Sequence, residues 1–291
     1  MNYPSTVKEL TETLRRGDYL ADRGLATAVF VAMSLKRPLL LEGEVGVGKT
    51  QIAKVLASVF DRKLIRLQCY EGIDTNQALY EWDYARQLLY IRALSDRDIG
   101  GEEAVEKLFG PRFLLERPLM QAIQLGEQAV LLIDEVDRAD DEFEAFLLEV
   151  LSDFQISIPE VGTIMAEHPP LVVLTSNRTR DLHDALKRRC MYHWIGYPEP
   201  DREVEIVVVQ APEVSEALAR KVVAAVNRLR EMDLAKPPGV AETIDWSRTL
   251  AFLGETGLNA AVADVTLGAI VKDRDDLALV RDNLSEVTSN A

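Results

Sequence analysis

Residues 43–50 read Gly-Glu-Val-Gly-Val-Gly-Lys-Thr, which matches the phosphate-binding loop GxxxxGK[ST] (Walker A) at its four defining positions. The glycines let backbone N–H groups approach the α- and β-phosphates of a nucleotide, and the helix that follows adds the positive end of its dipole. Lys49 would reach the β- and γ-phosphates, and the Thr50 hydroxyl would ligate Mg²⁺. The stretch therefore predicts a site for a nucleoside triphosphate and Mg²⁺.

The residues on both sides of this loop support the prediction. Leu39–Leu41 is an apolar run typical of a strand, and residues 51–57 are patterned as a helix. A glycine-rich turn without a ligand does not require this order of strand, loop and helix. A dinucleotide-binding loop is excluded because the glycines run GxxGxG instead of GxGxxG. We expect nucleotide contacts from the whole loop, namely Gly43, Glu44, Val45, Gly46, Val47, Gly48, Lys49, Thr50 and Gln51.

A second signature is the apolar run Val130–Ile133, which ends in Asp134 and Glu135 (Walker B). It predicts a buried parallel strand whose carboxyl end opens onto a site. Asp134 would orient Mg²⁺, and Glu135 would polarise the water that attacks the γ-phosphate. The acidic residues after Glu135 fit a solvated turn, and the phosphate loop is the reason to assign a metal role to Asp134.

Two further groups of residues allow more than one interpretation. Asn177 follows the apolar strand 171–175, where an amide could hold the attacking water, although asparagine is also a common turn former. Lys187, Arg188 and Arg189 form a run of cations before another apolar segment. Such a run is either a solvated helix end or a source of an arginine for the phosphates of a neighbouring subunit. Sequence spacing leaves both questions open.

The composition favours protein partners. The chain has 291 residues, 47% of them hydrophobic, and a formal net charge of −15 with a pI of about 4.8. So acidic a chain is repelled by nucleic acid and by anionic membranes. We expect neither nucleic-acid binding nor membrane insertion, and a cytoplasmic location, since no apolar run reaches spanning length. The two cysteines and three histidines form no metal-ligand pattern, and a GxSxG motif is missing from the sequence.

The ordered set of phosphate loop, Asp-Glu strand, strand-terminal asparagine and arginine pair resembles the MoxR branch of the AAA+ ATPases over roughly Asp18 to Leu258. More narrowly, residues 67–72, 78–84 and 188–194 look like the CoxD-like members linked to maturation of carbon monoxide dehydrogenase. The resemblance implies a P-loop NTPase of the α/β class, with a parallel sheet domain and a smaller α-helical lid domain.

The resemblance also implies roles for particular residues. Asn177 matches the sensor-1 position, Arg189 best matches the arginine finger with Arg188 as its rival, and Arg248 falls where the sensor-2 arginine is expected. The chain departs from the family at Ser247, where a proline is common before that arginine. The implied cofactors are ATP and Mg²⁺. The implied partners are further copies of the chain in a ring, which would be a hexamer, a protein with a von Willebrand factor A domain, and a client metalloenzyme.

The expected organisation follows from the same comparison. Residues 1–198 form the nucleotide-binding domain and 199–291 the helical lid, with a hinge at Tyr197–Pro200. Further expectations are a helix over Asp18–Leu35, an insert in the second helix at Tyr84–Tyr90, a hairpin over residues 154–164 just before sensor 1, and a frayed end over Asp282–Ala291.

The leading functional hypothesis is a Mg²⁺-dependent ATPase ring of the MoxR chaperone type, which remodels or matures a client metalloenzyme. One alternative is a nucleic-acid motor of the McrB-like or helicase-like kind, which would need basic residues on the hairpin. Residues 154–166 contain no Lys or Arg. Another is a nucleotide-gated protein-binding switch with negligible turnover, which the intact Asp134-Glu135 pair disfavours.

Overall fold

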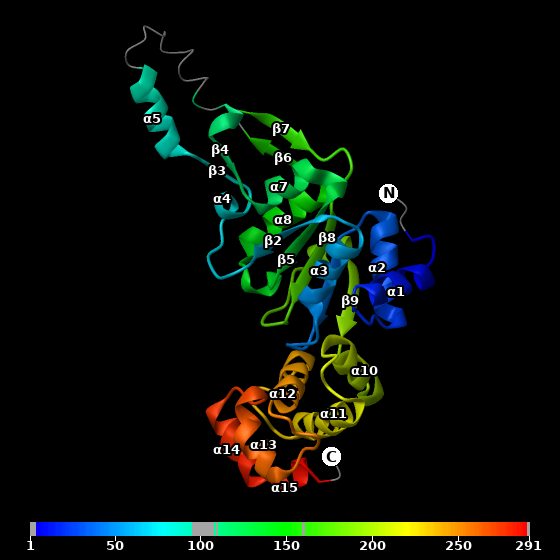
Figure 1. Cartoon of the computed structure of the whole chain (residues 1–291). Coiled ribbons are helices and arrows are strands. Elements are labelled where there is room, and N and C mark those ends of the chain that lie inside the picture. The colour runs from blue at the N-terminus through cyan, green and yellow to red at the C-terminus, as the bar shows by residue number, and fades with distance from the viewer. Residues whose placement is uncertain (1–3, 95–107, 109, 159–160, 290–291) are drawn as a thin grey trace. The chain divides into compact units, whose positions relative to one another are not determined.

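The computed structural model describes residues 4–94, 108, 110–158 and 161–289. The chain forms two compact units (Figure 1). The first comprises Met1–Thr13, Asp22–Glu42 and Thr50–His193, and the second comprises Leu14–Ala21, Gly43–Lys49 and Trp194–Ala291. The domain boundary at residue 198 stays a prediction.

A parallel five-stranded sheet organises the nucleotide-binding part of the chain, as predicted. Its order is β2-β5-β8-β1-β9, so the first strand of the chain lies between the last two. Strands β1, β5 and β8 are buried along their whole length, which explains their continuous apolar sequences. The strands are β1 (Leu39–Gly43), β2 (Lys63–Gln68), β5 (Ala129–Asp134), β8 (Leu171–Ser176) and β9 (Met191–Ile195).

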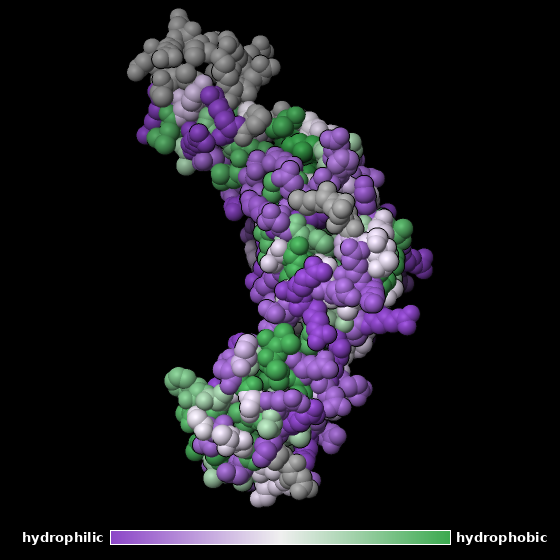
Figure 2. All heavy atoms as spheres, turned by 45° about the vertical axis from the view of Figure 1, so that its right-hand side comes forward, coloured by the Kyte–Doolittle hydropathy of each residue, from purple (hydrophilic) through white to green (hydrophobic). Residues whose placement is uncertain are grey.

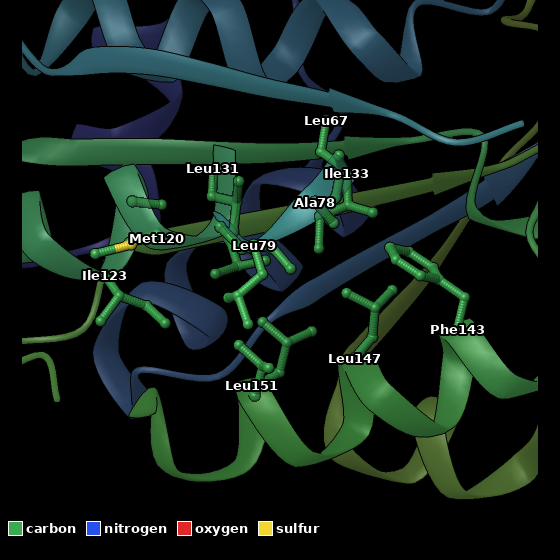
Figure 3. Close-up of a cluster of buried hydrophobic side chains, with 14 of the residues drawn as sticks. Leu67, Ala78, Leu79, Met120, Ile123, Leu131, Ile133, Phe143, Leu147 and Leu151 are labelled. Carbon is green, nitrogen blue, oxygen red and sulfur yellow. The ribbon is translucent and has the colours of Figure 1, made fainter. Parts of the chain in front are cut away.

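One face of this sheet is covered by helices α7 (Pro118–Leu125) and α8 (Asp141–Asp153). Figure 3 shows Phe143, Leu147 and Leu151 pointing from α8 toward the strands. These residues are four apart, so they share one helix face. Leu131 and Ile133 of β5 meet them, together with Leu67 of β2 and Met120 and Ile123 of α7.

The helix predicted over Asp18–Leu35 is shorter than expected. Helix α2 spans Arg23–Leu35, because the Asp22 side chain caps it by accepting the N–H of Leu25 at 2.7 Å. Asp18 has a φ of 57°, which is incompatible with a right-handed helix. The other elements of this part are α1 (Val7–Arg16), α3 (Lys49–Val59), α4 (Thr75–Ala78), β3 (Tyr80–Trp82), α5 (Tyr84–Leu94), β4 (Leu114–Glu116) and α9 (Asp184–Arg189).

The hairpin predicted before the third buried strand is present. Strands β6 (Gln155–Ile158) and β7 (Gly162–Met165) pair antiparallel, with Ile158 opposite Gly162. Pro159 and Glu160, which the sequence places in its turn, lie outside the described residues.

The second unit has a helical core of its own. Trp246 is fully buried, and its ring N–H donates to the Thr266 hydroxyl at 2.9 Å. The predicted frayed end is wrong for most of its length, because Val287 packs into this core from a short helix. Residues 290–291 lie outside the described part. The helices are α10 (Pro200–Gln210), α11 (Glu216–Glu231), α12 (Val240–Phe252), α13 (Ala260–Thr266), α14 (Arg274–Asp282) and α15 (Leu284–Val287).

A buried ion pair joins three of these helices. The Arg230 guanidinium binds both carboxylate oxygens of Glu203, at 2.7 and 2.8 Å, and both side chains are almost completely buried. Thr243 donates its hydroxyl proton to Glu203 at 2.7 Å. Because every charge has a partner, the pair fixes how α10, α11 and α12 pack.

The face of the molecule shown in Figure 2 is mainly polar. Hydrophilic side chains cover most of the face shown in Figure 2, in agreement with the net charge of −15. None of the helices described between residues 4 and 289 is both long and apolar enough to cross a bilayer.

Candidate functional site

The phosphate loop connects β1 to α3, as its sequence predicts. Lys49, the first residue of α3, is buried, and its Nζ donates to the carbonyl oxygens of Gly43 at 2.9 Å and Glu44 at 2.6 Å. A Cβ atom on Gly43 would lie 1.9 Å from the Ile195 carbonyl oxygen, so only glycine fits there. The backbone carbonyl groups at the start of the loop thus bind the ammonium group of Lys49.

The N-terminus of α12 packs against the same loop. Ala241 donates its N–H to the Gly46 carbonyl oxygen at 3.1 Å. A Cβ on Gly239 would lie 2.6 Å from the Val45 carbonyl oxygen, so glycine is required at this contact. The Glu242 carboxylate caps the helix by accepting the Gly239 N–H at 3.0 Å. Sequence reasoning missed this contact.

The structure brings together the two residues predicted to hold the metal. Asp134, the last residue of β5, is almost completely buried. Its Oδ1 accepts the hydroxyl proton of Thr50, the residue after Lys49, at 2.9 Å. The same oxygen accepts the hydroxyl proton of Thr175, from β8, at 2.6 Å. The two signatures, 84 residues apart in the chain, therefore share a direct hydrogen bond.

The other oxygen of Asp134 is paired with a residue that sequence reasoning missed. Arg66 of β2 donates to Oδ2 from Nε at 3.0 Å and from Nη2 at 2.6 Å. A carboxylate offers about four lone-pair positions. Two hydroxyl groups and two N–H groups fill them, so Asp134 is saturated with donors.

Glu135 is held by polar groups on three sides. Its backbone is left-handed (φ 54°, ψ 51°), a conformation that costs a residue with a side chain roughly 1 kcal/mol. Its N–H donates to the Thr175 hydroxyl oxygen at 2.9 Å. Its Oε2 accepts from Gln68 Nε2 at 3.1 Å and from Arg138 Nη1 at 3.2 Å. Thr175 thus connects Glu135 to Asp134, and strain is stored where the catalytic glutamate was predicted.

The acidic segment after Glu135 is only in part the solvated turn that the sequence suggested, because Asp140, Asp141 and Glu142 are exposed and Asp137 is not. Asp137 is buried, and its Oδ2 accepts the backbone N–H groups of Asn177 at 3.2 Å and Thr179 at 2.8 Å. Asp140 caps α8 by accepting the Phe143 N–H at 2.8 Å. Asp137 therefore fixes the turn that carries Asn177 at the carboxyl end of β8.

The predicted finger residues lie at the exposed C-terminal end of α9. The backbone carbonyl groups of Arg188 and Arg189 accept hydrogen bonds from the guanidinium of Arg37, with Nε 3.0 Å from the Arg189 oxygen. Arg37 supplies donors for the terminal carbonyls of this helix, which have no partners within it. These hydrogen bonds fix the backbone from which the side chains of Arg188 and Arg189 extend.

Arg248, the predicted sensor-2 residue, lies near the middle of α12. Its Nε is 3.3 Å from the Glu213 carboxylate, and its Nη2 donates to the Gln210 carbonyl oxygen at the end of α10. In this arrangement the guanidinium is engaged within the helical unit, and its role toward a nucleotide stays a prediction.

The two cysteines are buried. Burial, followed by the charge of Asp134, raises the pKa of the Cys69 thiol to about 12. Burial likewise raises the pKa of Cys190 to about 12. Both thiols therefore stay protonated near neutral pH, as is usual for small buried side chains that pack in a core.

The donor set suits Mg²⁺. The Thr50 hydroxyl and the Asp134 carboxylate are hard oxygen ligands of the kind that Mg²⁺ takes beside phosphate oxygens and water. Within the described ranges, His, Cys, Asp and Glu side chains form no group of three that could hold a metal by themselves.

Comparison with curated proteins shows distant relatives of unassigned function. An uncharacterized protein of Staphylococcus saprophyticus is 24% identical over 207 residues, which cover 69% of this chain and 71% of the relative. An uncharacterized protein of Staphylococcus aureus is 27% identical over 174 residues, covering 57% of this chain and 58% of the relative. Neither relative assigns a client or a partner.

Solved structures and a family description agree with the fold. A mutant of RuvB from Thermotoga maritima superposes with a TM-score of 0.51 at 18% identity, over 94% of this chain and 74% of that one. This likeness concerns the fold alone. Residues 38–190 match the family described as "AAA domain (dynein-related subfamily)", whose members use ATP and Mg²⁺. With its phosphate loop joined to the Asp-Glu strand, this chain belongs to that AAA family and is an ATPase.

Proposed function

We propose that this ATPase belongs to the MoxR type, assembles into a ring and uses ATP hydrolysis to remodel a client metalloenzyme. The observation that carries the catalytic part is the hydrogen bond between Thr50 and Asp134 at 2.9 Å. This contact supports a site in which one Mg²⁺ uses both the hydroxyl of the phosphate loop and the carboxylate of the acid pair.

Each residue has a defined task in this proposal. Lys49 exchanges its two carbonyl acceptors for phosphate oxygens, and the loop N–H groups bind the phosphates. Bound Mg²⁺ supplies positive charge for the β- and γ-phosphate oxygens. Glu135 accepts a proton from the attacking water, and Asn177 orients that water. The left-handed backbone of Glu135 supports this role because strain of this kind concentrates at functional sites.

The exposed arginines at the end of α9 support catalysis between subunits. Arg189, or its rival Arg188, would stabilise charge on the phosphates bound by a neighbouring copy. Arg248 would contribute from the lid after leaving Glu213. The ring, a hexamer by family resemblance, then couples nucleotide state to the arrangement of its subunits, because a ligand that favours one arrangement shifts the population toward it.

Helix α5 carries the exposed side chains that we propose for contact with a client. Helix α5 exposes Tyr84, Leu88 and Leu89, whereas Trp82 is buried and Tyr90 packs edge-on against Phe113 at 5.4 Å. Of these three aromatic residues, Tyr84 is thus the most accessible to a client. The metalloenzyme client, the partner with a von Willebrand factor A domain, the CoxD-like assignment and the cytoplasmic location rest on the family resemblance.

The nucleic-acid motor is the second candidate. Its support is the fold shared with RuvB, a likeness that at 18% identity concerns the fold alone. Against it stand the net charge of −15 and a hairpin segment, residues 154–166, that contains no Lys or Arg. The protein-remodelling function is therefore the better supported of the two.

Two experiments test the proposal. Glu135→Gln should bind ATP as the wild type does and release phosphate at a small fraction of its rate; normal turnover would contradict the role of Glu135. Arg189→Ala should bind ATP and lose activity, and mixing it with Lys49→Ala subunits should restore part of the hydrolysis. Arg188→Ala, mixed in the same way, tests the rival residue, and failure of both mixtures to recover activity would contradict an arginine shared between subunits.

A further inference from the structure

The carboxylate of Asp134 has no free acceptor position in this structure. Its Oδ1 is occupied by the hydroxyl groups of Thr50 and Thr175, and its Oδ2 by two N–H groups of Arg66. A carboxylate accepts about four hydrogen bonds, so neither a metal ion nor a metal-bound water can be added without removing a donor.

Arg66 is the donor that can leave. Thr175 is buried in the middle of the sheet, and Thr50 is fixed by α3. The Arg66 side chain is instead 52% exposed and comes from β2, which lies at the edge of the sheet. Its Nη2 already donates to the side-chain oxygen of Gln68, and water can solvate the rest of the guanidinium. Oδ2 is therefore the exchangeable oxygen of Asp134.

We propose that Arg66 is a counter-ion that competes with Mg²⁺ for Asp134, so that binding of the metal requires the guanidinium to leave Oδ2. The proposal rests on the metal role proposed above for Asp134. In the absence of metal, Arg66 neutralises a buried carboxylate that would otherwise be costly. When the metal binds, the positive charge of Arg66 opposes a second cation at the same oxygen. Arg66 thereby acts as a positioning residue that sets how strongly the site depends on Mg²⁺.

The test measures binding of a fluorescent, non-hydrolysable ATP analogue to the full chain in EDTA and in Mg²⁺. The ratio of the two dissociation constants is the gain in affinity due to the metal, and it cancels any general attraction of Arg66 for the nucleotide. Arg66→Gln should raise this gain about tenfold, the factor expected when a charge-assisted pair no longer has to be broken. Arg66→Lys keeps the positive charge and loses the two-pronged guanidinium contact. Its gain in affinity due to the metal should lie between those of the wild type and Arg66→Gln.

Lys63→Gln is the matched control, because it removes one positive charge from an exposed position on the same strand. Its gain should equal that of the wild type. Asp134→Asn distinguishes a failure of the competition by Arg66 from a failure of the metal role of Asp134. If Asp134→Asn loses the gain and Arg66→Gln and Arg66→Lys both keep the wild-type value, the competition is refuted and the metal role of Asp134 stands. If Asp134→Asn keeps the wild-type gain, the metal role fails, and the competition fails with it.

Discussion

Replacing Thr175 by valine tests whether one buried hydroxyl group holds the two acids in place. The change keeps the shape of the side chain and removes only its hydrogen-bonding capacity. In the wild type this hydroxyl donates to Asp134 at 2.6 Å and accepts the N–H of Glu135 at 2.9 Å. The valine variant leaves a partly buried amide N–H without this acceptor and a buried carboxylate oxygen with one donor fewer.

The expected loss of stability can be estimated from these contacts. A buried polar group that loses its partner costs about 1–3 kcal/mol, and the Asp134 oxygen keeps its bond to Thr50. We therefore expect the free energy of unfolding to fall by about 2–3 kcal/mol, measured by urea denaturation. The turnover rate should fall about tenfold to a hundredfold in a phosphate-release assay, because Glu135 loses the contact that fixes its backbone.

Thr175→Ser is the matched control for this experiment. It retains the hydroxyl and loses one methyl group, which should cost about 1 kcal/mol of stability and leave most of the turnover. The reasoning would be refuted if the valine variant had the same free energy of unfolding and the same turnover rate as the serine variant. A valine variant with unchanged stability and lost turnover would restrict Thr175 to a catalytic effect.

Three other predictions concern the rest of the molecule. Glu203→Gln should lower the free energy of unfolding, measured in urea, by about 3–5 kcal/mol, because it leaves the charge of Arg230 buried and unpaired. Its control is Glu216→Gln, which breaks an exposed ion pair and should lower the free energy of unfolding by under about 1 kcal/mol. Burial lowers the pKa of His193 from 6.5. The contribution of the neutral imidazole to stability is therefore complete above pH 6.5 and is lost as the pH falls through the folded-state pKa. His193→Gln should flatten the fall in melting temperature between about pH 7.5 and 5.5. Cys69 should react with iodoacetamide at pH 8 far more slowly in the native protein than in urea; equal rates would contradict its burial.

Much of the fold could be predicted because its signals are local. Strands such as β5 and β8 are continuous apolar runs, and both the phosphate loop and the acid pair directly follow such a strand. The helix limit at Asp22 had a local signal too, since aspartate is a preferred N-cap, and the prediction overlooked it.

The partners of the acids could not be predicted because they depend on strand register. Gln68 lies opposite Asp134 only because β2 and β5 pair in that register, and Arg66 reaches the same carboxylate from two residues earlier. In sequence, Arg66 is an ordinary polar residue alternating with apolar ones. The burial of Asp137 is likewise non-local, because its acceptor oxygen is used by backbone N–H groups about 40 residues away. Such pairings follow from the assembled sheet.

The most direct test of the central claim is an experimental structure of the Glu135→Gln variant with ATP and Mg²⁺. We expect a metal ion at about 2.0–2.1 Å from the Thr50 hydroxyl oxygen and in contact with Asp134, either directly or through a bound water. We also expect that Lys49 Nζ has left its carbonyl acceptors for the phosphates. A nucleotide bound with its metal remote from Thr50 and Asp134 would contradict the account.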